Sequence, residues 1–260
     1  MSFDQALLCG EKIPNSSLKN LLIETSLYHI VVVSSAHLLF LKSTLEHTGL
    51  RFIPRFLRPA VLSILLTGYG LMTSLEAPIL RALVAEMLSL GANRFKLNWK
   101  PHQIILFSVI ICLGIHPKLI QSLSLQLSMM TAMGLSIEFQ IENSSKKVFL
   151  QAFVLYLLLF PLLALIFTPH PVGIFFNAFL APFISNILLP FSIISTFHEW
   201  FRLFYIQFLD LFLITLRSLS PGSVSKIVSD PYPYHLTWVY CLFCWSVLSA
   251  SFTIKKRYFE

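Results

Sequence analysis

Charged side chains are scarce in this sequence of 260 residues, because Asp, Glu, Lys and Arg together make up only 12% of it. Soluble domains carry about 25% charged residues. Hydrophobic residues reach 56% of the chain, and Phe alone accounts for 24 residues. A water-soluble fold of this size could not bury so much apolar surface. The composition therefore excludes an ordinary soluble domain and predicts that lipid solvates much of the chain.

Motifs of enzymes and of additional domains are also missing. The sequence contains no nucleophile elbow, phosphate-binding loop, metal-ligand motif or paired carboxylates at a cleft, so we expect no catalytic activity, cofactor or metal site. No repeat, low-complexity run or long polar stretch is present, which predicts one domain over residues 1–260. Residues 1–19 are too charged for a cleavable signal peptide, and we expect them to form a short segment before a retained first span.

Cysteines are few, with four in the chain. Cys241 and Cys244 have the C-x-x-C spacing, but no second pair accompanies them. A zinc site of this type needs four converging ligands, and such cysteines in apolar runs are more often small buried hydrophobes. The cysteines do not decide the redox compartment.

Long apolar runs between prolines and glycines predict an all-α, polytopic transmembrane bundle of about eight or nine spans, since about 20 apolar residues cross the hydrocarbon core. The expected spans are residues 21–41, 60–72, 77–90, 103–115, 119–137, 148–167, 172–195, 200–219 and 235–254. Each arm of the pair at 60–90 measures only about 21 Å at 1.5 Å per residue. The pair forms either two tilted spans or a re-entrant hairpin, and its turn near Gly68, Gly70 and Glu76 is a candidate pore element.

Basic residues indicate the orientation of these spans. If the N-terminus lies outside, thirteen Lys and Arg fall in inside segments and five in outside segments, with Arg81 inside a span. Such an excess is typical of cytoplasmic loops. We therefore expect a multi-pass protein with an extracytoplasmic N-terminus and a cytoplasmic C-terminus. Much of the net charge of +7 is then an orientation signal rather than evidence for DNA binding.

Two histidines share a broad face of the first expected span, which also contains polar serines. His29 and His37 are eight residues apart, or about 80° around a helix, and Ser34 lies between them. An ionisable group within a span costs about 2.5–3.5 kcal/mol and usually faces a bundle interior or a wet cavity. These residues form either a polar lining or hydrogen bonds to neighbouring helices, and the sequence leaves both interpretations open.

Other polar residues interrupt later spans. Arg81 near the middle of its span either meets a phosphate or forms an internal ion pair with Glu76 or Glu24, since a buried Arg needs a partner. The Gln126 amide needs a partner for the same reason. A stripe of small residues predicts close helix packing and comprises Ser124, Ser128, Ala132 and Ser136.

Several short motifs resemble the competence domain of ComEC-type DNA-uptake proteins. Residues 29–37 resemble the family's His-(four apolar)-Ser-Gly-Leu-His, with Ser35 and Ala36 in place of the glycine and leucine. Further matches are Ala6-Leu7-Leu8-Cys9-Gly10-Glu11-Lys12, Leu65-Leu66-Thr67-Gly68 followed by Pro78-Ile79-Leu80-Arg81-Ala82, Pro117 with Leu125-Gln126-Leu127-Ser128 and Gly134, and Asn177 to Pro182. They occur in the family's order over most of the chain and coincide with the polar positions above.

The resemblance implies the bacterial inner-membrane channel through which single-stranded DNA enters the cytoplasm during natural transformation. It implies as partners single-stranded DNA, the lipid bilayer, a periplasmic DNA receptor, a separate nuclease and a cytoplasmic helicase. Larger relatives add an OB-fold domain and a metallo-β-lactamase-like domain, which we do not find here, so we expect no nuclease activity. The residues expected to line the pore or the DNA path are His29, Ser34, His37, Gly68, Arg81, Gln126 and Ser128.

Two other functions are compatible with the sequence. A secondary transporter for a small solute would explain the polar residues and the broken run at 60–90, although it would be favoured by internal repeats that are not evident. A non-transporting membrane scaffold would have every polar residue paired inside a packed bundle. The sequence does not decide the oligomeric state.

Overall fold

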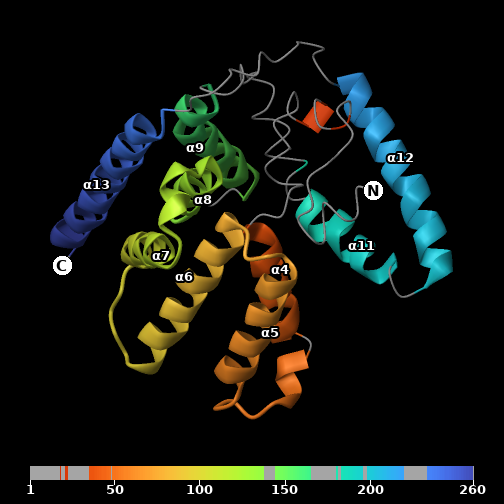
Figure 1. The fold of residues 1–260 in the computed structure, drawn as a ribbon, viewed down its shortest axis with the longest axis horizontal. Coiled ribbons are helices and arrows are strands. Elements are labelled where there is room, and N and C mark those ends of the chain that lie inside the picture. The colour runs from red at the N-terminus through yellow and green to blue at the C-terminus, as the bar shows by residue number, and fades with distance from the viewer. Residues whose placement is uncertain are drawn as a thin grey trace. The chain divides into compact units, whose positions relative to one another are not determined.

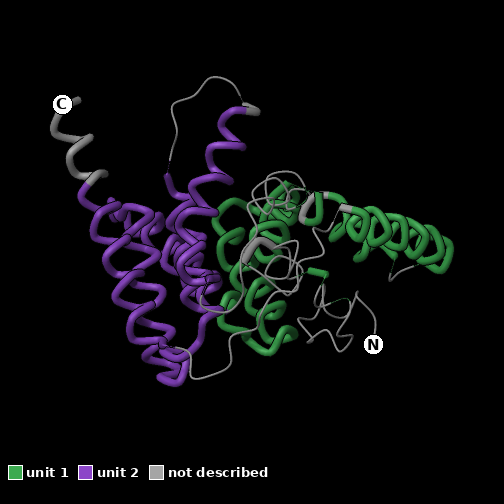
Figure 2. The backbone as a smooth tube through the Cα atoms, turned by 90° about the horizontal axis from the view of Figure 1, so that it is seen from above, with its two compact units in different colours: residues 1–79, 166–228 green, residues 80–165, 229–260 purple. Residues whose placement is uncertain are grey.

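The computed structural model describes residues 18, 21–22, 35–47, 49–137, 144–164, 180, 183–195, 198–219 and 233–259. These residues form helices joined by turns, and no β-strand occurs among them, so the all-α prediction is confirmed. The chain packs as two compact units, one of residues 1–79 with 166–228 and one of residues 80–165 with 229–260 (Figure 2).

The first unit contains α4 (Ser35–His47), the 3-10 helix η1 (Gly49–Phe52) and α5 (Arg58–Met72) from the N-terminal part of the chain. From the later part it contains the π-helical turn η3 (Ile184–Leu188), α11 (Leu189–Ser195) and α12 (Glu199–Leu219) (Figure 1). Helix α4 packs against η1, α5 and η3, and α11 packs against α12. Residues far apart in sequence therefore meet in one core.

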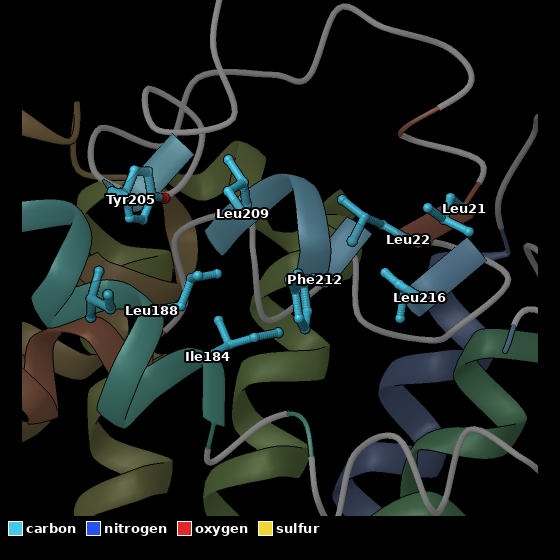
Figure 3. Packing of buried hydrophobic residues seen from close by; sticks show 9 residues of the cluster. Leu21, Leu22, Ile184, Leu188, Tyr205, Leu209, Phe212 and Leu216 are labelled. Carbon is cyan, nitrogen blue, oxygen red and sulfur yellow. The ribbon is translucent and has the colours of Figure 1, made fainter. Parts of the chain in front are cut away.

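That core is centred on one face of α12. Tyr205, Leu209, Phe212 and Leu216 are buried and recur every three or four residues, which places them on one stripe of the helix. They pack against Leu21 and Leu22 and against Ile184, Leu188 and Leu189, with Ile184 pointing toward Phe212 (Figure 3). Burial of this apolar stripe holds α12 to η3 and α11.

Helix α5 is joined to α6 (Ala77–Arg94) by a tight turn. The Leu75 amide and the Thr73 hydroxyl both donate hydrogen bonds to the carbonyl of Gly70, at 2.9 and 3.0 Å. Ser74 has a φ of 56° and Leu75 a φ of 49°, in the left-handed region that reverses the chain. The short pair of helices expected near residues 60–90 is therefore present, with α6 continuing to Arg94.

The second unit is organised around α8 (Leu123–Leu135). It contacts α7 (Pro101–Ile115), α9 (Ser144–Ala164) and α13 (Tyr234–Phe259), and the unit also contains α6 from Leu80 onward (Figure 1). Buried residues cover most of the circumference of α8, and Ser124 and Leu135 lie on its exposed side.

Helices α8 and α9 approach each other closely at Gly134 of α8. A Cβ atom built on Gly134 would lie 2.5 Å from a methyl carbon of Leu155 and 3.2 Å from one of Leu158, both on α9. The small-residue stripe predicted from sequence is not what makes this contact, because Ser124 is exposed and Ser128 points elsewhere. The missing side chain of Gly134 is what lets α8 and α9 approach.

The expected single span at residues 119–137 is wrong. Pro117 starts a 3-10 helix, η2 (Pro117–Gln121), and Ser122 then caps a separate α8 by accepting a hydrogen bond from the Leu125 amide. At 1.5 Å per residue α8 is about 20 Å long. The expected spans at 21–41 and 172–195 also differ where they are described, because α4 continues to His47 and residues 184–188 are π-helical.

One helix in the described ranges is long and apolar enough to cross a membrane, the part of α9 from Lys146 to Ala164. Helices α7 and α8 are apolar but shorter. A bundle of eight or nine spans is therefore not confirmed by the helix lengths, and it stays a prediction.

Candidate functional site

Arg81 on α6 is the most deeply buried arginine that the structure describes, with 4% of its surface exposed. Its Nε donates a hydrogen bond of 2.8 Å to Oγ of Ser128 on α8. The fully buried thiol of Cys112, on α7, lies close enough to the guanidinium for an electrostatic interaction. Three helices of the second unit thus contribute one polar side chain each to a single cluster.

The contacts of the guanidinium leave most of its donors unused. A guanidinium carries five N–H donors, and a buried cation is normally paired with an anion. In the described part of the chain Arg81 donates to one neutral hydroxyl and contacts no carboxylate. The predicted ion pair with Glu76 is not formed there, and Glu24 lies outside the described residues. The remaining donors have the planar geometry that recognises phosphate oxygens in pairs.

Gln126 is fully buried on α8 but points away from Arg81. Its Nε2 lies 3.5 Å from the backbone carbonyl oxygen of Tyr234 at the start of α13, at the long limit of a hydrogen bond. Gln126 and Ser128 are two residues apart, which separates their side chains by about 200° around the helix. The structure therefore brings Arg81 and Ser128 together and directs Gln126 toward another helix.

The other predicted residues lie in the first unit or outside the described ranges. His37 is buried on α4, with 4% of its surface exposed. Gly68 on α5 is exposed, and no heavy atom lies within 4 Å of the position that a Cβ would occupy. His29 and Ser34 fall among residues that the structure does not describe. A common lining of all seven residues stays a prediction.

Sequence reasoning did not select Cys112 and His102, which are among the buried residues of the second unit. Cys112 was grouped with inert apolar cysteines, although it lies within electrostatic range of Arg81. His102 lies one residue before the predicted span at 103–115, but α7 begins at Pro101 and buries it. The proline at the first helical position is the signal that could have extended that span. Among the described residues, no group of three or more His, Cys, Asp or Glu is arranged to hold a metal ion.

Helix α13 is held to the rest of the second unit by hydrogen bonds to backbone carbonyls. Nε1 of Trp238 donates to the carbonyl of Ile120 in η2, and Nε1 of Trp245 donates to that of His102 at 3.1 Å. The Tyr240 hydroxyl donates to the carbonyl of Leu158 on α9, also at 3.1 Å. These contacts fix α13 beside α7, α8 and α9.

Comparison with protein families gives one match. A family model described as "Competence protein" matches residues 7–253, nearly the whole chain and all of the candidate residues. This agrees with the resemblance carried by the short motifs. Neither the curated proteins nor the solved structures contain a match to this chain.

Proposed function

This chain belongs to the Competence protein family, and we propose that it forms the inner-membrane channel through which one strand of DNA enters a competent cell. The observation that carries the proposal is Arg81, a buried cation whose described hydrogen-bond partner is a single hydroxyl. A DNA phosphate is the ligand class that would complete its hydrogen bonding. No catalytic step is part of the proposal.

Exposed apolar faces support the membrane location. On α13 the exposed side chains include Leu236, Val239, Phe243 and Val247, which lie within about 80° of one another around the helix. Helix α9 has an equivalent face that comprises Phe149, Phe153, Leu157 and Phe160. Water-soluble proteins rarely expose contiguous apolar patches of this kind. We therefore place both faces in lipid and propose a multi-pass protein with an extracytoplasmic N-terminus and a cytoplasmic C-terminus.

Single-stranded DNA is a polyanion with one charge per about 3.4 Å, so it needs a wet passage that the hydrocarbon cannot provide. A passage lined by many basic side chains would bind the strand too tightly for it to move. Isolated basic side chains and hydroxyls would bind it weakly enough to allow transport. Arg81 with Ser128 is such an isolated site. We propose that His29, Ser34, His37, Gly68 and Gln126 contribute the rest of the path within one channel domain.

The other parts of the uptake system follow from the same proposal. The sequence shows no ATP-binding motif, so a cytoplasmic helicase or the membrane potential would supply the energy. A periplasmic receptor would deliver the DNA, and a separate nuclease would degrade the other strand. Residues 1–19 would then lie on the receptor side of the membrane.

The test is natural transformation of a deletion strain complemented with charge variants of Arg81. We expect Arg81→Glu to lower uptake of labelled DNA at least a hundredfold, because repulsion replaces attraction for phosphate, and Arg81→Lys to retain part of it. Ser108→Ala is the matched control, since the buried Ser108 hydroxyl bonds only the Ile105 carbonyl of its own helix. Normal uptake by an Arg81→Glu protein that is present in the membrane at wild-type level would contradict the proposal.

A further inference from the structure

The segment between α4 and α5 contains an Arg-Phe pair that occurs twice and that the proposed channel does not use. It runs Arg51-Phe52-Ile53-Pro54 and then Arg55-Phe56-Leu57-Arg58, so that an Arg-Phe pair recurs after four residues. No acidic residue occurs anywhere between residues 47 and 75. We call residues 49–58 the Arg-Phe loop.

Hydrogen bonds fix the conformation of the Arg-Phe loop. Leu50 is buried at its start, and the Ile53 amide donates to the Leu50 carbonyl at 3.1 Å. At its end the Arg58 side chain donates through Nε to the Ile53 carbonyl at 3.0 Å and through Nη2 to the Arg51 carbonyl at 3.4 Å. Arg58 therefore acts within the protein and holds the loop in shape.

The same conformation presents the two phenylalanines outward. Phe52 is 91% exposed and Phe56 is 80% exposed, and Leu57 beside them is also exposed. Leaving such rings in water costs the free energy that burial would recover. A loop whose hydrogen bonds direct two rings into solvent points to an apolar partner for them.

The other two arginines of the loop, Arg51 and Arg55, can contact an anionic group of that partner. Arg51 and Arg55 are exposed. Within the ranges that the structure describes, neither guanidinium forms a hydrogen bond or an ion pair. Each lies directly before one of the exposed rings, so apolar and cationic groups alternate along the same short segment.

We infer that the Arg-Phe loop is a binding site for anionic phospholipid, in which Phe52 and Phe56 enter the acyl boundary while Arg51 and Arg55 contact headgroup phosphates. The inference rests on the membrane location in the proposed function, but not on the passage of DNA. Basic residues with apolar side chains are the combination by which surface segments bind anionic bilayers.

The helix that follows the loop supports this position. Helix α5 has 15 residues and is about 22 Å long, shorter than the hydrocarbon core of about 30 Å. Its apolar side chains Ile64 and Leu65 are exposed one to two turns beyond the loop. A short helix with an exposed apolar surface keeps its end near the headgroups, where arginines reach phosphate and rings reach the acyl chains.

A single-stranded nucleic acid is the other polyanion that could contact arginines and phenylalanines. Single strands bind through base stacking on aromatic rings and through arginines along the backbone. The exposed surface here continues through the aliphatic residues Leu57, Ile64 and Leu65, which contribute nothing to stacking and are suited to acyl chains. Lipid is therefore the occupant that accounts for the whole surface.

The experiment uses the full-length chain with its native cysteines replaced by alanine and an environment-sensitive fluorophore at Gly49→Cys. Gly49 begins the loop, and no atom lies within 4 Å of the position of an added Cβ. The labelled protein is reconstituted into vesicles of phosphatidylcholine with or without phosphatidylglycerol, and is titrated in detergent with short-chain phosphatidylglycerol. We expect a blue shift that depends on the anionic lipid.

Charge and ring variants test which groups act. Arg51→Gln with Arg55→Gln should weaken phosphatidylglycerol binding roughly 30-fold, because each arginine near an anionic surface contributes about fivefold. Phe52→Ser with Phe56→Ser should abolish the blue shift. The matched control is Arg202→Gln with Arg217→Gln, which removes the same charge from exposed positions on α12 of the same unit and should leave binding unchanged.

The outcomes separate this inference from the proposed function. A wild-type chain that inserts equally into both vesicles, with no lipid-dependent shift, overturns the inference and leaves the membrane location standing. A chain that inserts into neither vesicle overturns the proposed function itself. A shift produced by a single-stranded oligonucleotide instead of phosphatidylglycerol, and lost with Arg51→Gln and Arg55→Gln, identifies a nucleic-acid site and also overturns the inference.

Discussion

Arg81 of α6 and Ser128 of α8 are 47 positions apart in the sequence, and their side chains are joined by a buried hydrogen bond of 2.8 Å. This contact ties α6 to the central helix of the second unit. The sequence predicted a packing role for Ser128. In the structure, the Ser128 hydroxyl accepts a hydrogen bond from a buried cation. A structural and a functional role for Arg81 can therefore be separated by changing its partner.

Ser128→Ala should destabilise the protein by about 1–3 kcal/mol, because it leaves a buried guanidinium without its acceptor. The double variant with Arg81→Met and Ser128→Ala should recover most of the lost stability. Neither a buried unpaired charge nor an unsatisfied hydroxyl then remains. Denaturant unfolding of the purified protein in detergent measures both effects.

DNA uptake should respond differently from stability in the same variants. The stable double variant with Arg81→Met and Ser128→Ala should still fail to take up DNA, because the cation is gone. Ser108→Ala should change neither quantity, since its hydroxyl bonds only its own helix. Uptake that simply follows stability across the series would assign Arg81 a purely structural role.

Gly134→Leu should separate α8 from α9. The added side chain would meet Leu155 and Leu158, so we expect a destabilisation of at least about 1–3 kcal/mol from overpacking. Gly114→Ala on α7 of the same unit is the comparison, because no atom lies within 4 Å of its added Cβ and alanine favours the helix by up to about 1 kcal/mol. Thermal unfolding should move in opposite directions for the two changes, and equal melting temperatures would contradict the close approach.

Tyr240→Phe should loosen α13. The change removes the hydroxyl, which donates to the Leu158 carbonyl on α9 and also interacts with Cys244 on its own helix, so we expect a loss of about 1 kcal/mol. Tyr234→Phe is the matched control on the same helix, because the Tyr234 hydroxyl makes no described hydrogen bond, while its carbonyl still faces Gln126. Unfolding of the two variants in detergent would detect the difference. Identical behaviour of the two variants would show that this bond does not hold α13.

Topology can be tested with single cysteines on opposite sides of α7. We expect a cysteine at Asn98→Cys to react only after the membrane is permeabilised and one at Lys118→Cys to react in intact spheroplasts, since the first lies in an inside segment and the second in an outside one. Both positions are exposed in the structure. The background replaces Cys9, Cys112, Cys241 and Cys244 by alanine. Reaction of both cysteines from the same side would exclude a crossing by α7.

Helix positions were the most predictable part of the fold. Pro59 and Pro101 lie in the first turns of α5 and α7, where a backbone N–H would have no acceptor within the helix. The helices expected there have nearly the observed bounds. The prediction failed at residues 119–137 because the apolar run continues through a place where Pro117 and Ser122 set up a 3-10 turn and a new cap. Hydropathy measures solvent preference and does not register a local change of backbone geometry.

Single candidate residues were predictable, but their partners were not. Arg81, Gln126 and Ser128 stand out because polar groups in apolar runs need hydrogen bonds. Which group supplies them depends on how α6, α8 and α13 are rotated and aligned, and one residue changes the direction of a side chain by about 100°. Cys112 has no sequence feature that marks it as the neighbour of a guanidinium.

The sequence by itself determined that this chain is helical and strongly apolar, that it resembles the competence family, and which polar residues must be accommodated, because these properties follow from composition and local pattern. Only the tertiary structure decided that Ser128 meets Arg81, that Gln126 faces Tyr234, that Gly134 permits α8 to approach α9, and that Phe52 and Phe56 are left exposed. Those outcomes depend on contacts between residues distant in the chain, whose geometry is set by helix packing.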